Sequence, residues 1–187
     1  MLWDTHMHTH FSGDSNADPA AMARSAIEKN LAGICITDHL DYDYPDEPDL
    51  FTIDFPQYEK GIRQLQADFS DSLNINFGIE LGLQPHLAKK HHEILQEMDF
   101  DFVIGSSHVV HGLDPYYPAY YEGRSEHAAY LEYFESILEN IAAFHEFDVY
   151  GHIDYVVRYG PEKNKNYSYD KYKDVIDEIL RQLIARG

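Results

Sequence analysis

Imidazole and carboxylate side chains stand at or directly after the ends of five short apolar stretches of this sequence. Histidine is abundant, with 12 residues in 187, whereas cysteine occurs once. Imidazole and carboxylate ligands without thiolate suit Zn, Mn or Fe, and the residue types do not choose among these ions. The pattern therefore predicts a site for divalent metal, with these candidate ligands: His6, His8, Asp14, His39, Glu80, His108 and His152.

His6 and His8 lie two residues apart at the end of the first apolar stretch. On a strand this spacing points both imidazoles to the same side, where they can bind one cation. A solvent-facing polar pair is the alternative, but the first strand of a parallel sheet is normally buried on both faces. Asp14 follows in a Ser-Gly-Asp-Ser segment, where it is either a ligand of a second or third ion or an ordinary turn residue.

Glu80 lies inside the apolar stretch Gly78–Gly82, where an unpaired charge is costly. The charge of Glu80 must be neutralised either by metal or by an Arg or Lys partner. If metal neutralises it, the carboxylate can bridge two ions. His39 directly follows Asp38 and is either a ligand whose ring Asp38 orients, or a histidine packed at a strand end.

His108 and His152 each have a glycine nearby, Gly105 and Gly151, which allows the backbone to approach a ligand closely. His10 and His111 flank the ligand clusters and are candidates for substrate contacts. We expect the remaining histidines of the predicted helices to be solvated surface groups: His86, His91, His92, His127 and His145.

The elements that must position these side chains alternate between short apolar runs and longer amphipathic segments, which is typical of a parallel α/β sheet. In such folds the carboxyl ends of the strands share one face, so the candidate ligands should converge there. The predicted strands are Leu2–His8, Gly33–Thr37, Ile75–Leu81, Phe102–Ser106 and Val149–His152.

Five amphipathic segments between and after these strands predict helices. The first begins at Pro19 with Asp18 as its N-cap, and the last carries an apolar stripe that includes Ile176 and Ile179. Two long loops connect predicted elements, 38–54 and 107–124. Loops of this length in a compact domain usually have a functional role. The predicted helices run from Pro19 to about Asn30, Phe55 to Ser70, Pro85 to Met98, Ser125 to Phe147 and Tyr169 to Arg186.

Composition and charge exclude several classes of protein. Lys and Arg number 14 against 33 Asp and Glu, a formal net charge of −19, which argues against binding to nucleic acid or to an anionic membrane. One cysteine excludes an intrachain disulfide framework and favours a reducing compartment. With no predicted signal segment and no apolar run of membrane-spanning length, we expect a cytoplasmic, soluble protein of one domain.

The ordered set of candidate ligands resembles that of the polymerase-and-histidinol-phosphatase (PHP) superfamily over the whole chain. The stretches Asp4–Ser12, Gly105–His108 and Gly151–Asp154 are similar to those of its monofunctional histidinol-phosphate phosphatases. The resemblance implies a distorted, seven-stranded (β/α) barrel of the TIM-like type that holds two to three divalent ions.

The resemblance also assigns roles to the candidate ligands. His6 and His8 would bind the first ion, and Glu80 would bridge it to a second ion completed by His108 and His152. Asp14 and His39 would serve the third. Arg158 resembles the family's phosphate-clamping arginine, with Lys163 and Lys165 adding positive charge in the same loop.

One departure from the family's pattern concerns the end of the chain. Family members carry an Asp-x-His on a final strand, and nothing like it follows His152. We therefore expect residues 1–187 to form a single PHP-type domain that is incomplete at its C-terminus and contains five of the seven βα units. Exposed sheet edges of such a domain would favour a homo-oligomer.

The function that these expectations favour is a metal-dependent phosphomonoesterase, L-histidinol-phosphate phosphatase of histidine biosynthesis, acting on a small-molecule phosphomonoester. A metal-bound water would attack the phosphorus, and His39 is a candidate acid for the leaving group. The alternatives are a PHP-type phosphotyrosine-protein phosphatase or other phosphoesterase, and a non-catalytic metal-binding remnant.

Overall fold

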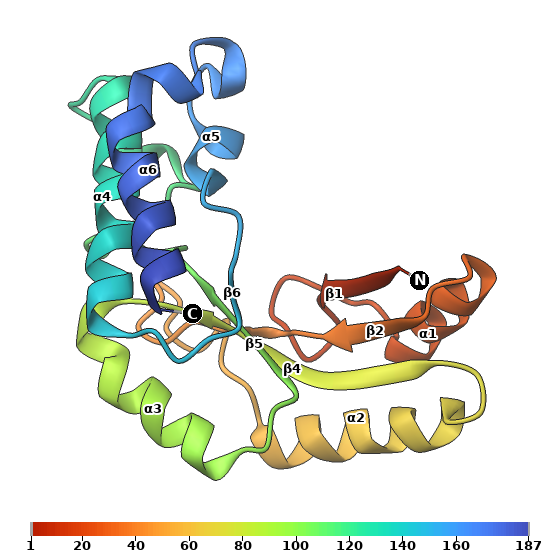
Figure 1. The fold of residues 1–187 in the computed structure, drawn as a ribbon. Helices are drawn as coiled ribbons and strands as arrows, with labels where there is room; N and C mark the ends of the chain where they lie inside the picture. Colours follow the sequence, from red (N-terminus) through yellow and green to blue (C-terminus); the bar gives the residue numbers. More distant parts are fainter. Residues whose placement is uncertain (1, 187) are drawn as a thin grey trace. The chain divides into compact units, whose positions relative to one another are not determined.

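The structure, a computed structural model, describes residues 2–186 and divides into two compact units. The first unit contains the residues up to Leu81 together with Glu93–Ile104, and the second contains Gly82–His92 and Gly105 onward. The chain passes from one unit to the other near the ends of β4 (Asn74–Gly82) and β5 (Phe102–Ser106) and inside α3 (Ala88–Glu97). Figure 1 labels most of the elements, and strands alternate with helices along most of the chain.

Parallel strands form the framework of the first unit. β1 (Trp3–Met7) pairs with β2 (Gly33–Ile36), and β2 pairs in turn with β4. Each residue of β2 is buried, as its unbroken apolar sequence predicts for a strand covered on both faces. The parallel α/β class predicted from the sequence is therefore confirmed.

Two helices of this unit begin where their capping residues predict. Asp18 accepts hydrogen bonds from the backbone N–H groups of Ala20 and Ala21 at the start of α1 (Pro19–Glu28). Asp54 accepts one from Gln57 at the start of α2 (Phe55–Phe69). A carboxylate at this position satisfies N–H groups that have no partner within the helix, and the proline in each first turn has no N–H to satisfy.

A two-residue strand that the sequence analysis does not predict, β3 (His39–Leu40), pairs with the end of β4. Its register places His39 opposite Glu80 and Leu40 opposite Leu81. A strand of two residues is too short to show the alternation of apolar and polar residues that predicts a strand from sequence. Only its pairing with β4 identifies it.

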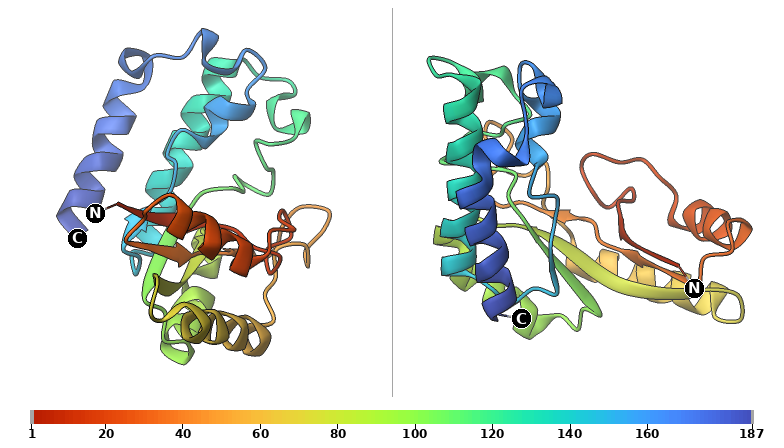
Figure 2. Two further views of the ribbon diagram at one scale, coloured as in Figure 1. Left: turned by 90° about the vertical axis from the view of Figure 1, so that its right-hand side faces the viewer. Right: turned by 45° about the horizontal axis from the view of Figure 1, so that its top comes forward.

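The second unit is mostly helical. α4 (Glu126–Ala143) and α6 (Tyr169–Arg186) pack side by side (Figures 1 and 2), and α5 (Tyr155–Tyr159) also contacts α4. Beside β6 (Val149–Tyr150), the N–H of Gly151 donates to the carbonyl of Gly105 at the end of β5. Short 3-10 turns complete the unit: η1 (Pro85–Leu87), η2 (Pro118–Tyr121) and η3 (Lys163–Lys165).

The core of this unit combines buried aromatic and aliphatic residues. Tyr130, Tyr133 and Phe134 of α4 are fully buried and pack in one cluster with Tyr172 and Ile176 of α6. The apolar stripe predicted on the last helix therefore faces α4.

Several boundaries differ from the sequence prediction. α4 ends at Ala143 rather than Phe147, because Phe144 is extended (φ −146°, ψ 135°) and buries its ring beyond the helix end. α5 was not predicted, since its five residues are too few for a helical period to be visible. Gly105 leaves room for the side chains of Phe147 and Leu83 rather than for a ligand.

One histidine expected at the surface is buried. His91 has no exposed area, and its ring lies against Phe144, with centroids 5.5 Å apart. The prediction of a surface group was wrong for His91, because Phe144 leaves α4 and covers this face of α3. His86, His92, His127 and His145 are exposed as predicted.

Cys35, the one cysteine of the sequence, is buried in β2. Among residues 2–186 the structure contains no helix that combines the length and the hydropathy needed to cross a membrane.

A buried tyrosine ties the end of β2 to the middle of β4. The Tyr58 hydroxyl lies 2.8 Å from the carbonyl oxygen of Gly78 and 3.2 Å from that of Ile36, and it accepts from the N–H of Asp38. Tyr58→Phe leaves these buried backbone groups without this partner, which costs about 1–3 kcal/mol. Urea unfolding should show this loss, while Tyr117→Phe, at a ring 40% exposed, should change stability by less than about 0.5 kcal/mol. Equal stabilities of the two variants would contradict this role.

Candidate metal centre

The strand register of the first unit brings three imidazoles to the Glu80 carboxylate. The His6 Nε2 atom lies 2.9 Å from Glu80 Oε2, and His8 Nε2 lies 3.3 Å from the same oxygen. His39 Nδ1 also lies 3.3 Å from it, because β3 pairs His39 directly with Glu80. Four of the predicted ligands therefore meet at one carboxylate oxygen.

Glu80 has no exposed area, so its negative charge needs compensation from neighbouring groups. Bonds of about 2.0 Å at a tetrahedral ion place two ligand atoms about 3.3 Å apart. The distances from Glu80 to His8 and His39 match this spacing, and the donor atoms of His6, His8 and Glu80 lie within 4.8 Å of one another. The donor set therefore fits a divalent ion.

A second group of donors surrounds His39. Its Nε2 atom lies 3.7 Å from Asp14 Oδ2, and its Nδ1 atom lies 3.3 Å from Asp41 Oδ2. His8, Asp14 and His39 form a further group whose donor atoms lie within 4.8 Å of one another. Asp14 and His39, which were predicted to serve one ion together, therefore lie in one group, and His8 lies in the same group.

The protonation of His8 suits metal binding. Burial, followed by the neighbouring His39 imidazole, lowers the pKa of His8 to about 4, although Glu80 opposes this shift. The ring is therefore neutral at pH 7, the form in which imidazole binds metals. Its buried Nδ1 atom has no hydrogen-bond partner among the described residues.

Asp38 holds the segment that follows β1. Its two carboxylate oxygens accept hydrogen bonds from the backbone N–H and the hydroxyl of Thr9, the latter at 2.7 Å. Burial raises the pKa of Asp38 to about 6, while the two bonds from Thr9 lower it. Asp38 therefore fixes the chain next to His8, and its hydrogen bonds go to Thr9 rather than to the His39 ring that we expected it to orient.

Two further predicted ligands lie together in the second unit. His108 is 4% exposed, and its ring centroid lies 5.3 Å from that of His152. His108 follows β5 and His152 follows β6, so the paired ends of these strands bring the two rings together.

These donor groups agree with the comparison of the chain with protein families. The model of the PHP domain matches residues 4–187. The chain belongs to the PHP domain family. The resemblance inferred from the ligand motifs is thus confirmed.

Relatives within the PHP family carry a specific enzyme name. A histidinol-phosphatase of Lactococcus lactis is 33% identical over 184 residues, which are 98% of this chain and 68% of the relative. A protein of Clostridium acetobutylicum is 31% identical over 186 residues, 100% of this chain and 70% of its own length.

Solved structures of PHP proteins are also similar to this chain. The structure of the L. lactis histidinol phosphate phosphatase in complex with zinc, L-histidinol and phosphate matches with a TM-score of 0.94, over 99% of this chain and 70% of that chain, at 33% identity. A structure from Listeria monocytogenes, 20% identical, matches with a TM-score of 0.83 over 98% of this chain and 79% of that chain, which shows the fold.

The two candidates for substrate binding lie in the second unit. Arg158 is an exposed residue of α5, with its guanidinium carbon 5.8 Å from the centre of the Tyr159 ring. His111 contacts two carboxylates of α4, Glu132 at 3.3 Å and Glu139 at 3.1 Å. Their substrate contacts stay predictions for this PHP protein.

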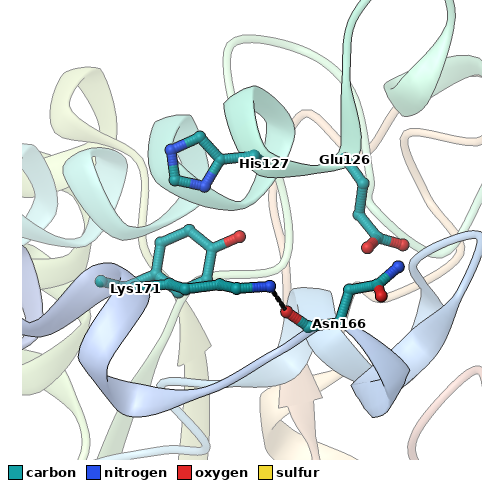
Figure 3. Close-up of a pocket in the computed structure, with 5 residues that line it drawn as sticks. Glu126, His127, Asn166 and Lys171 are labelled. Atoms are coloured by element: carbon teal, nitrogen blue, oxygen red, sulfur yellow. Dashed lines mark hydrogen bonds between the residues drawn. The ribbon is translucent and has the colours of Figure 1, made fainter.

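A pocket of the second unit contains none of the candidate ligands. Glu126, His127, Asn166, Lys171 and Tyr172 line it (Figure 3). Lys171 donates to the backbone carbonyl of Asn166, and the ring of His127 lies 5.1 Å from that of Tyr172. The contact between His127 and Tyr172 joins the start of α4 to the start of α6.

Sequence reasoning missed several residues around the donor groups. Asp41 is 2% exposed and contacts His39, but in the sequence it is one of seven acids in loop 38–54. Thr9, Tyr58 and Tyr155 act through hydrogen bonds or ring contacts with partners distant in the sequence. The position of Asp41 two residues after His39, an alternation like that of His6 and His8, was the available signal.

Removal of the Glu80 charge should weaken metal binding. Glu80→Gln preserves the shape of the side chain but leaves three imidazoles without the anion that they contact. Zinc titration of the full Glu80→Gln chain should show fewer bound ions than the wild type. The zinc affinity should fall by more than roughly 10–100-fold, the loss typical when a residue that only contacts a metal ligand is replaced. Glu59→Gln, at an exposed pair with Arg63 on α2, is the matched control. Unchanged stoichiometry and affinity in Glu80→Gln would contradict the assignment.

Proposed function

We propose that this chain is a metal-dependent phosphomonoesterase that hydrolyses L-histidinol phosphate to L-histidinol and phosphate, a reaction of histidine biosynthesis. The observation that carries the proposal is the set of three imidazoles around the buried Glu80. It is supported by the 33% identity to an L. lactis histidinol phosphate phosphatase whose structure holds zinc, L-histidinol and phosphate.

The candidate ligands divide into groups that would hold two to three divalent ions, and we propose that these ions are zinc. His6, His8 and Glu80 form one group, and His39 with Asp14 and Asp41 lies beside it. His108 and His152 supply a further pair of imidazoles. The bridging role expected of Glu80 stays a prediction.

When bound, divalent ions lower the pKa of a water and offset the charge of phosphate oxygens. The protein must also hold the phosphate, and we assign this to Arg158, whose guanidinium can donate two parallel hydrogen bonds to one phosphate group. Its exposure leaves these donors accessible. In a chain of net charge −19, such cationic groups make an anionic substrate tolerable.

Hydrolysis breaks the bond between phosphorus and the histidinol oxygen, so that oxygen must receive a proton as it leaves. His39 is the candidate acid from the sequence. Both of its nitrogens face carboxylates, Nδ1 toward Glu80 and Asp41 and Nε2 toward Asp14. This position favours a ligand role for His39, and we leave its acid role as a prediction.

The proposal is tested by comparing substrates. Zinc-loaded protein should hydrolyse L-histidinol phosphate with a kcat/KM at least about 100-fold above that for phosphotyrosine, since a built site discriminates strongly against a substrate that leaves its polar groups unpaired. His8→Ala, purified in the same way, controls for contaminating phosphatases and should be inactive. Occupied metal sites without hydrolysis would contradict the enzyme assignment, and a higher kcat/KM for phosphotyrosine would contradict the substrate.

A further inference from the structure

Tyr155 lies against the imidazoles of both His108 and His152. Its ring centroid is 5.3 Å from that of His108, in an edge contact, and 5.5 Å from that of His152. The two imidazoles are themselves 5.3 Å apart. A single aromatic ring thus contacts both members of the pair.

Tyr155 is held in this position from two other sides. Its hydroxyl donates to Asp114 Oδ1 at 3.1 Å, and its ring stacks on Tyr133 of α4 at 6.2 Å. Asp114 is 4% exposed, and the same oxygen accepts the N–H of Tyr116 at 2.7 Å. The carboxylate is therefore a fixed acceptor, and Tyr155 cannot turn away without breaking its hydrogen bond to this buried side chain.

The backbone that carries the two imidazoles is tied together by a separate set of bonds. The hydroxyl of Ser107, the residue before His108, lies 2.6 Å from the hydroxyl of Tyr150 and accepts from Asn140 Nδ2 at 2.6 Å. Tyr133 donates to the Ser107 carbonyl at 2.9 Å. These bonds hold the segments that carry His108 and His152, whereas the contact with Tyr155 acts on the imidazole rings themselves.

We propose that Tyr155, anchored by Asp114, is a positioning residue that sets the orientation of the His108 and His152 imidazoles for binding an ion. The inference deepens the proposed function and rests on it for the consequence for hydrolysis. Metal ligands must be held within about 10–20° of their productive direction, and groups that orient them typically contribute 10–100-fold to affinity. Tyr155 supplies this restraint through ring contacts.

The test is a zinc competition titration against a chromophoric chelator, with the full chain. Comparison of the wild type with His152→Ala identifies the bound zinc ion that depends on the His108 and His152 imidazoles. Tyr155→Phe keeps the ring but loses the hydrogen bond to Asp114, so the affinity for that zinc ion should fall about tenfold. Tyr155→Leu also removes the ring, and the affinity should fall up to about 100-fold. Tyr117→Phe makes the same chemical change at a loop tyrosine whose ring contact is with Tyr116, and should have no effect.

Hydrolysis gives the second readout. For Tyr155→Phe, kcat/KM for L-histidinol phosphate should fall at limiting zinc and recover at saturating zinc, which a misfolded variant would not do. An unchanged zinc affinity in Tyr155→Phe and Tyr155→Leu, or the lack of any His152-dependent ion in the wild type, overturns the inference. So does a KM that stays raised at saturating zinc, because the hydroxyl would then contact the substrate.

Failure of the proposed function gives a different result. The wild type would then bind the His152-dependent zinc ion and hydrolyse no phosphomonoester. Weaker zinc binding by Tyr155→Phe would still support the positioning role in that case.

Discussion

The buried negative charge of Glu80 is the constraint on which the candidate site depends. A carboxylate removed from water is stable only beside groups that compensate its charge, and here three imidazoles lie within 3.3 Å of one of its oxygens. His6 and His8 come from the end of β1, and His39 comes from β3. The parallel register of these strands with β2 and β4 therefore determines the chemistry, because a shift of one residue would turn the side chains to the opposite face.

Hydrogen bonds from other elements restrain the strand ends that carry the donors. In the first unit, Asp38 holds Thr9 beside His8, and Tyr58 joins β2 to β4. In the second unit, Ser107 is bonded by Asn140 and Tyr150. Both units thus fix short ligand-bearing segments with buried hydroxyl and carboxyl groups. This is the arrangement that a PHP enzyme needs if its ligands are to keep their geometry during turnover.

Much of this framework was predictable from the sequence for identifiable reasons. The capping residue Asp18 and the uninterrupted apolar run of β2 are local signals, and parallel strands bring His6, His8, His39 and Glu80 to one edge whatever the details of packing. The role of Tyr155 and the burial of His91 depend on tertiary contacts that no local pattern reveals, whereas the spacing of Asp41 from His39 was a local signal hidden among the other acids of its loop. The residue types and their spacing predicted a metal site but no substrate. The phosphatase activity was predicted from the resemblance to the PHP family over the whole chain.

Two arrangements place imidazole nitrogens at such distances from Glu80: hydrogen bonds from imidazole N–H groups, and ligands that share an ion. Anomalous diffraction at the zinc absorption edge, from crystals of the zinc-loaded protein, separates the two most directly. The account predicts a peak within about 2.0–2.2 Å of Glu80 and of the His6 and His8 imidazoles. No peak there, with His6 Nε2 still 2.9 Å from Glu80 Oε2 in fully zinc-loaded crystals, would contradict it.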